Sequence, residues 1–148
     1  MSHTTSISSV RIKSISALRA AVEELRSNGM SIQMIADATP RAYYSNQAGM
    51  GAAPYVIQLP SANYDIGVYP AADGDGYELR TDLWGGSVER VLGAKASSAA
   101  TAEQAKLGRL YQMYAIAATE ERAAEQGMQV ERTLEADGSI QLLVTGYQ

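Results

Sequence analysis

Apolar and polar residues alternate along two segments in the middle of the chain, residues 64–69 and 77–83. A period of two is typical of strands in a sheet that buries one face. The residues between the segments, 70–76, read PAADGDG, and this proline and these glycines favour a turn. The pattern therefore predicts a β-hairpin, followed by a short helix with Ser87 as its N-cap.

The first part of the chain predicts a strand, a helix and a second strand. Residues 5–13 alternate with a change of phase that a β-bulge between Ser8 and Val10 would explain. Apolar residues then recur at spacings of three and four, which indicates one buried face of a helix with Ser16 as its N-cap. Residues 30–34 alternate again and predict the next strand.

Residues 41–54 show no periodic pattern and form the longest predicted loop of the chain. The loop carries one arginine, two adjacent tyrosines and a Gly-Met-Gly sequence. Loops of this length are usually either functional or disordered. Residues 55–59 follow the loop and predict a further strand.

A long helix is predicted from Thr101 onwards, because its apolar residues recur with helical spacing. Its predicted buried stripe consists of Leu107, Leu110, Tyr111, Tyr114 and Ala118. We expect the two tyrosines of this stripe to pack in the core rather than to form a binding surface.

The last predicted unit is a second hairpin. Residues 128–135 and 140–144 alternate on either side of an Asp-Gly turn at positions 137 and 138. Arg132 is the one polar residue on the inward-facing side of the first of these strands.

Hairpins connect most of these strands, so the sheet should be mainly antiparallel. The amphipathic helices need one common surface on which to bury their stripes. We therefore predict an α+β fold in which residues 1–148 form one domain, with helices packed on one face of the sheet.

Composition narrows the class of protein. The chain has no cysteine, which excludes disulfides, thiolate metal sites and a cysteine nucleophile. The net charge is −4 and there is no basic run, so we expect no nucleic-acid partner. No apolar run approaches the roughly 20 residues that span a membrane. The N-terminus lacks the apolar region of a secretory signal, and we expect a soluble, cytoplasmic protein.

Short motifs in a consistent order along nearly the whole chain carry a family resemblance. They lie at residues 1–3, 17–25, 63–67, 77–79, 82–84, 87–92, 110–115, 124–128 and 137–142. With these motifs the chain resembles the hypothetical chloroplast reading frame thirty-five family, a domain of unknown function found in plastids, cyanobacteria, other bacteria and bacteriophages. That family has no agreed activity, so the resemblance implies a fold but no chemistry.

The resemblance also implies a context. Family members are often encoded beside an ATPase of the AAA type, which implies an accessory protein with such a partner. Members usually carry an aromatic-rich insertion around Trp84, and here it is reduced to Gly85 and Gly86. The short insertion and the ordinary length suit a bacteriophage copy, which would act in the host cytoplasm.

Enzymatic chemistry has little support in the sequence. His3 is the only histidine, and no carboxylates lie near it at the spacing of metal ligands. The glycine pairs at positions 49 and 51 and at positions 74 and 76 do not match known phosphate-binding loops and are typical of turns. We therefore expect a protein that is not an enzyme and that needs no metal or cofactor.

Aromatic and cationic residues form the best candidate site. Arginine offers bidentate contacts to anions, and tyrosine and tryptophan offer faces for stacking. We predict that the 41–55 loop and the 80–90 corner hold the ligand or partner through Arg41, Tyr43, Tyr44, Tyr55, Arg80, Trp84 and Arg90. The alternative is that these are separate surface and rim residues.

Two functions remain open. The first is a non-enzymatic accessory or interaction protein, for which the family resemblance implies an AAA-type ATPase as the protein partner. The second is a protein that sequesters a small, anionic, nucleotide-like ligand. A homo-oligomer is compatible with both.

Overall fold

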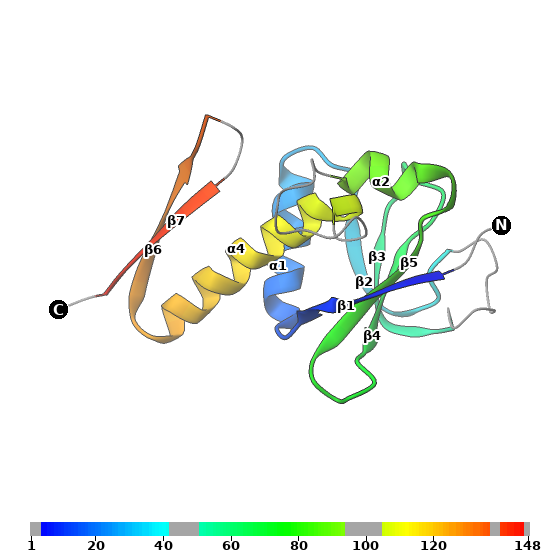
Figure 1. The fold of residues 1–148 in the computed structure, drawn as a ribbon, viewed down its shortest axis with the longest axis horizontal. Coiled ribbons are helices and arrows are strands. Elements are labelled where there is room, and N and C mark those ends of the chain that lie inside the picture. The colour runs from blue at the N-terminus through cyan, green and yellow to red at the C-terminus, as the bar shows by residue number, and fades with distance from the viewer. Residues whose placement is uncertain (1–3, 42–50, 94–104, 137–139, 147–148) are drawn as a thin grey trace.

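The computed structural model describes residues 4–41, 51–93, 105–136 and 140–146, and Figure 1 shows how they are arranged. Five strands form an antiparallel sheet in the order β1-β5-β4-β3-β2. Their bounds are β1 Thr4–Ile12, β2 Gln33–Ala38, β3 Ala53–Gln58, β4 Ile66–Pro70 and β5 Tyr77–Asp82.

The described helices lie on one face of this sheet (Figure 1). They are α1 (Ile15–Ser27), α2 (Ser87–Leu92) and α4 (Gly108–Glu125), and a 3-10 turn, η1 (Trp84–Gly86), precedes α2. Fully buried side chains from α1, α4 and β5 meet in one apolar core, among them Leu18, Leu110 and Leu79. The predicted α+β fold, with an antiparallel sheet and helices on one face, is confirmed.

A second, two-stranded sheet follows α4. It consists of β6 (Met128–Leu134) and β7 (Ile140–Gly146), paired in register from one end to the other. In Figure 1 this hairpin stands beyond the C-terminal end of α4, on the far side of the helices from the main sheet. Both strands agree with the sequence prediction, whereas the predicted Asp137–Gly138 turn lies outside the described residues.

The predicted phase change in β1 is confirmed. Ile7 pairs with Leu79, but Ile12 pairs with Tyr77, so five positions of β1 face two positions of β5. A bulge absorbs the extra residues and lets Ile12 lie in the core, where it is fully buried.

The predicted N-cap residues of two helices are wrong by one or two positions. Helix α1 begins after Ser14, whose Oγ accepts a hydrogen bond of 3.1 Å from the backbone N–H of Ala17. Ser16, the predicted cap, instead donates a hydrogen bond of 2.6 Å to Glu121 of α4. Ser87 is the first residue of α2 rather than its cap, and its Oγ accepts a hydrogen bond of 3.0 Å from the N–H of Asn63.

The predicted start of the strand at residues 30–34 is also wrong, because β2 begins three positions later, at Gln33. Met30 lies in the turn that closes the C-terminal end of α1, where its N–H donates to the carbonyl of Leu25 at 3.1 Å. Ile32 is buried from within the connecting loop, so its apolar character reflects core packing rather than strand alternation. The predicted 41–54 loop is likewise shifted, because β2 ends at Ala38 and β3 starts at Ala53.

Both tyrosines of the α4 stripe face the core, as predicted. Tyr114 is buried, and its hydroxyl oxygen accepts hydrogen bonds from the N–H groups of Lys13 at 2.9 Å and Ser14 at 3.3 Å. Tyr111 packs against the same core, and among the described residues its buried hydroxyl has no hydrogen-bond partner. Burial raises the pKa of Tyr111 well above the ordinary value for a phenol.

Candidate functional site

Arg41, the first residue of the predicted site, is held by the protein's own carboxylate. Its Nη2 lies 2.8 Å from Oδ1 of Asp65 and also donates to the carbonyl of Leu59 at 2.8 Å. Asp65 is buried and accepts further hydrogen bonds from the N–H groups of Arg41 at 3.0 Å and Leu59 at 3.2 Å. These contacts raise the pKa of Arg41 and fix the entrance to the predicted loop against the β3–β4 connection.

Arg80 lies on the face of the sheet that the helices do not cover. Its guanidinium group pairs with Glu78 at 2.9 Å and stacks over the ring of Tyr69, 4.5 Å from the ring centroid. The Tyr69 hydroxyl donates to the carbonyl of Gly51 at 2.7 Å. Burial raises the pKa of Tyr69, and the positive charge of Arg80 partly opposes this rise.

Tyr55 lies on the opposite face from Arg80. It pairs with Val68, which belongs to the helix-covered core, whereas Arg80 pairs with Gly67 on the other face. The ring of Tyr55 packs edge-on against Tyr77 at 6.2 Å between centroids. The sheet therefore separates two of the residues that the sequence predicted to share one site.

The remaining predicted residues divide into two groups. Tyr43 and Tyr44 lie outside the described residues, and of Trp84 only the backbone, at the start of η1, is described. Arg90 is described, and its Nη1 donates to the carbonyl of Gly85 at 3.1 Å. Gly86, at a φ of 77°, leaves room for this guanidinium group, because a Cβ there would lie 3.3 Å from Arg90 Nη1.

The described residues contain no group of three or more histidine, aspartate or glutamate side chains placed to hold a metal ion. None of the helices in this part of the chain combines the length and the apolar character needed to cross a bilayer.

The β6–β7 hairpin presents an unusual surface that the sequence did not single out. Residues that pair across the hairpin share a face, so Arg132, Leu142 and Ile140 all point towards the helices. Ile140 and Leu142 pack against the main core. On the same face of the hairpin, Leu134 is 74% exposed and Val144 is 42% exposed.

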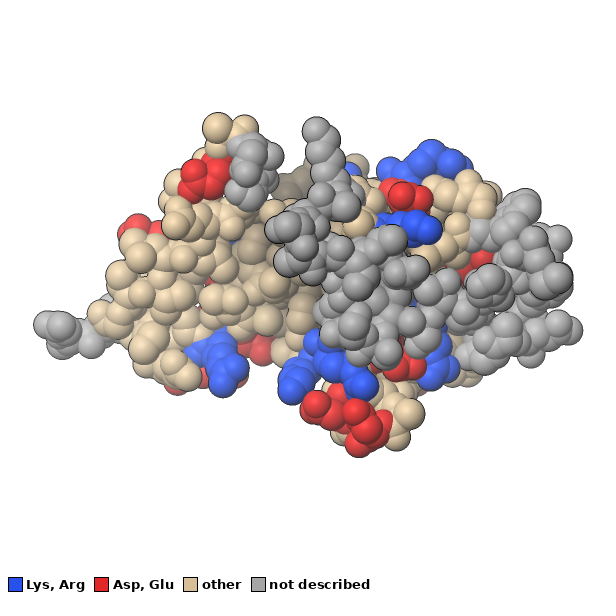
Figure 2. Space-filling view, in the orientation of Figure 1, with Lys and Arg blue, Asp and Glu red and all other residues tan. Residues whose placement is uncertain are grey.

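The outer face of the hairpin is mostly polar but carries Leu143, which is 55% exposed and pairs with Glu131. Figure 2 shows that the surface over the hairpin and the adjoining part of α4 is largely uncharged. Among the described residues neither β6 nor β7 has a further strand beside it, so each presents an unpaired edge. An isolated two-stranded hairpin is at best marginally stable, and this one needs contacts beyond its own hydrogen bonds.

Arg132 provides the main polar link between the hairpin and the helices. Its guanidinium group pairs with Glu24 of α1 at 2.7 Å and with Glu120 of α4 at 2.7 Å. A second nitrogen of Arg132 contacts each carboxylate, Nη2 with Glu24 Oε1 at 3.0 Å and Nε with Glu120 Oε2 at 2.8 Å. Each carboxylate is therefore held bidentately. The hydrogen bonds that Glu120 and Glu24 accept from Arg132 raise the pKa of this arginine above its usual value. Arg132, which the sequence pattern places on the inward-facing side of its strand, is therefore paired with two glutamates from the helices.

We expect Arg132→Met to loosen the hairpin. The substitution keeps the apolar stem of the side chain but leaves Glu24 and Glu120 without their shared cation. Because all three side chains are about one-third exposed, solvent screening limits the loss to about 1–2 kcal/mol of unfolding free energy. Hydrogen exchange should become faster in β6 and β7 than in the main sheet.

Arg122→Met is the matched control for this prediction. Arg122 is an exposed residue of α4, and among the described residues it has no carboxylate partner. Urea unfolding and amide hydrogen exchange should leave the Arg122 variant near the parent. Equal exchange rates in the two variants would contradict a role for Arg132 in holding the hairpin.

The fold and the surfaces described above define an α+β domain with a projecting hairpin. A family model described as "Protein of unknown function (DUF1257)" matches residues 21–143. The match covers most of the chain, and the protein belongs to this family. Searches of curated proteins and of solved structures each return no match.

Proposed function

We propose that this protein is a non-enzymatic interaction protein that docks on its partner through the β6–β7 hairpin. The observation that carries the proposal is the pair of open strand edges flanked by exposed apolar side chains, Leu134, Leu143 and Val144. Exposed apolar surface next to an open edge is typical of protein-binding sites. The family match leaves this role open, since the family has no assigned function.

The chemistry of the hairpin favours one kind of partner. Strand β7 reads IQLLVTG and carries no charged residue, so its edge lacks the charges that usually block pairing with another strand. The exposed charges around it are acidic, at Glu131 and Glu135. Arg132 is neutralised by its two glutamates. A fitting partner therefore offers a strand edge or an apolar groove with lysine or arginine at its rim.

An ATPase of the AAA type is the partner class that the family resemblance implies, and we propose it as the partner to test. We also propose that the protein is encoded by a bacteriophage. The second function, sequestration of a small anionic ligand, is favoured by a different observation, a groove between α1, α2 and α4 that is lined by two arginines.

The test is a binding assay between the purified protein and the AAA-type ATPase encoded beside it. Leu134→Lys and Leu143→Lys place a charge on each face of the hairpin at exposed positions, so both variants should remain folded. We expect each to weaken binding at least tenfold, which corresponds to about 1.4 kcal/mol. Gln112→Lys, at an exposed position of α4, adds the same charge away from the hairpin and should bind as the parent does.

Three results would contradict the proposal. The first is no binding of the ATPase by the parent, and the second is unchanged binding by both leucine variants. The third is a homodimer of the parent that Leu143→Lys dissociates, as measured by light scattering, because the hairpin would then be an interface between two copies.

A further inference from the structure

A groove of about 410 Å³ lies where the end of α1 meets α2 and the start of α4. Its polar lining comes from four separate parts of the chain. Asn28 and Ser31 follow α1, Ser61 lies between β3 and β4, Arg90 belongs to α2, and Arg109 belongs to α4. Side chains far apart in sequence therefore converge on one open volume.

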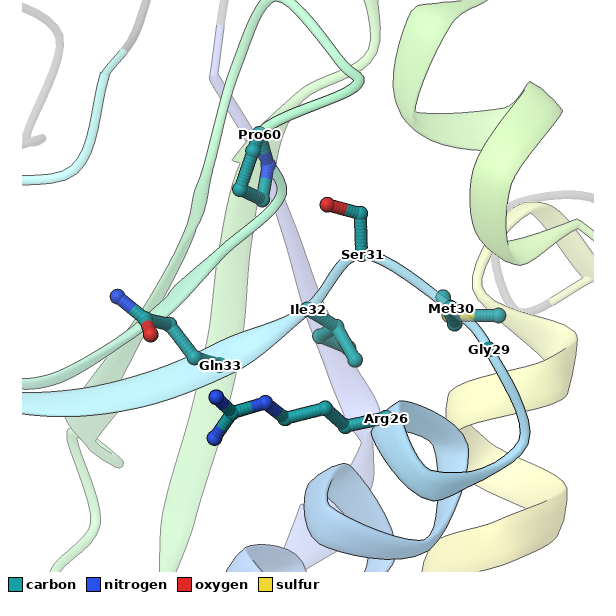
Figure 3. A pocket seen from close by; sticks show the side chains of 7 residues that line it. All are labelled: Arg26, Gly29, Met30, Ser31, Ile32, Gln33 and Pro60. Atoms are coloured by element: carbon teal, nitrogen blue, oxygen red, sulfur yellow. The ribbon is translucent and has the colours of Figure 1, made fainter.

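A second pocket of about 390 Å³ adjoins this groove. The two share residues 29–31 as a common wall. Figure 3 shows that Arg26 extends from the end of α1 along this second pocket, with Gln33 and Pro60 also at its lining. The second pocket thus places another guanidinium group on the same side of the molecule, although Arg26 has a carboxylate, Glu23, at 3.9 Å.

The groove is positively charged in a protein whose net charge is −4. None of its lining residues is acidic, and two of them are arginines. The C-terminal end of α1 opposes this charge with roughly −0.5 of an elementary charge, which is less than the contribution of either guanidinium group. The local potential therefore favours an anion.

Both guanidinium groups are positioned by backbone carbonyls and retain free donors. Arg90 Nη1 donates to Gly85 O at 3.1 Å, and Arg109 Nη1 donates to Val91 O at 3.3 Å. Neither arginine has a carboxylate partner within the described part of the chain. Each guanidinium group has five N–H donors, so most of them remain available to a ligand.

The uncharged lining residues add further hydrogen-bonding groups. Over the described ranges, the side chains of Asn28, Ser31 and Ser61 make no hydrogen bond to the protein. Two hydroxyl groups and one amide therefore accompany the two cations. Such a mixture suits a ligand that has both charged and hydroxylated parts.

We propose that this groove binds the phosphate monoester of a small organic molecule. A phosphate monoester carries a charge of about −1.5 to −2 at pH 7. The two arginines therefore balance a phosphate ligand better than they would balance a ligand with a single carboxylate. The volume exceeds what phosphate alone needs and lies in the range of small-molecule sites, about 300–1,000 Å³. Apart from Arg90, none of its polar residues belongs to the site that the sequence predicted.

The experiment measures thermal unfolding in inorganic phosphate, ribose 5-phosphate, sulfate or sodium chloride at one ionic strength. At about five times its dissociation constant, ribose 5-phosphate should raise the Tm of the parent by roughly 2–4 °C relative to sodium chloride. Arg90→Gln and Arg109→Gln should lose this specific rise. Arg122→Gln removes an exposed arginine of the same helix outside the groove and should keep it.

Titrations of ribose 5-phosphate followed by ³¹P NMR supply a second readout that does not depend on the stability of the protein. The phosphorus signal should shift with the parent and with Arg122→Gln, but not with the two groove variants. Arg109→Lys, which keeps the charge but loses the fork of donors, should bind at least several-fold more weakly than the parent. If either glutamine variant is unfolded at the titration temperature, the lysine variant decides the outcome.

Phosphate stabilises many proteins by exclusion from their surfaces, and this effect needs no site. An equal rise of Tm in the parent and in all the variants would show that exclusion alone is at work and would overturn the proposal. A response to sulfate as large as the response to ribose 5-phosphate would show a general oxyanion site and would contradict an organic phosphate as the ligand.

Discussion

Replacing Asp65 with alanine is expected to lower the free energy of unfolding by about 3 kcal/mol. The Asp65 carboxylate is buried and accepts hydrogen bonds from the guanidinium group and the N–H of Arg41 and from the N–H of Leu59. Its removal leaves the buried Leu59 N–H without an acceptor, at a cost of about 1–3 kcal/mol, and releases the cation. Arg41 is half exposed, so water solvates its guanidinium group and keeps the loss below that of a fully buried pair.

Urea unfolding followed by circular dichroism measures this effect. Asp75→Ala is the matched control, because Asp75 is exposed and its ion pair with Lys13 spans 3.4 Å at the surface. The control should change stability little. If the two alanine variants were equally stable, the Asp65 cluster would have no special role in fixing Arg41 against the β3–β4 connection.

The central hairpin could be predicted because its pattern and its burial have the same cause. Ile66, Val68 and Leu79 alternate with residues on the uncovered face, and one buried face imposes that period on any strand. The same reasoning placed Tyr111 and Tyr114 on the core side of α4. Periodicity therefore gave the layers of the fold, since it records which side of an element is buried.

Periodicity gave wrong predictions where a residue is buried but does not belong to a helix or strand. Ile32 is buried in a loop, so its apolar character was interpreted as part of a strand that begins only at Gln33. At the start of α1 several serines compete for the capping position. Ser14 takes it, and the hydroxyl groups of Ser14 and Ser16 both donate to Glu121, a residue more than one hundred positions away. A partner so distant in sequence leaves no local signal.

The candidate site shows the same limit more strongly. The sequence predicted Arg41 and Arg80 as binding residues, and both have partners in the fold, Asp65 and Glu78. No sequence pattern indicates Arg109, because its place in one groove with Arg90 depends on how α2 and α4 meet. Only Arg132 gave a usable signal, as a polar residue in an inward-facing position, and its partners come from two helices.

The proposed hairpin interface and the proposed phosphate groove can be tested separately. The hairpin is tied to α1 and α4 through Arg132, whereas the groove lies where α1 ends and α4 begins. Substitutions at Leu134 or Leu143 should leave the phosphate response unchanged. Substitutions at Arg90 should leave partner binding unchanged, unless ligand and partner are coupled through the two helices.

The second large effect is expected for Tyr114→Ala, which should lower the free energy of unfolding by about 4 kcal/mol. Truncation of a buried aromatic ring usually costs about 3–5 kcal/mol. The lost hydroxyl also leaves the N–H groups of Lys13 and Ser14 without their acceptor, at the junction between β1 and α1. Tyr114→Phe keeps the ring and removes only the acceptor, so it should cost about 1–2 kcal/mol.

Tyr111→Phe is the sharpest comparison, because it makes the same chemical change in a hydroxyl group that has no partner among the described residues. Removing a buried, unpaired hydroxyl should leave the free energy of unfolding unchanged or raise it by up to about 1 kcal/mol. Urea unfolding of the two phenylalanine variants thus tests the hydrogen bonds directly. A loss at Tyr111 that equals the loss at Tyr114 would show that the Tyr114 hydroxyl does not join α4 to the start of α1.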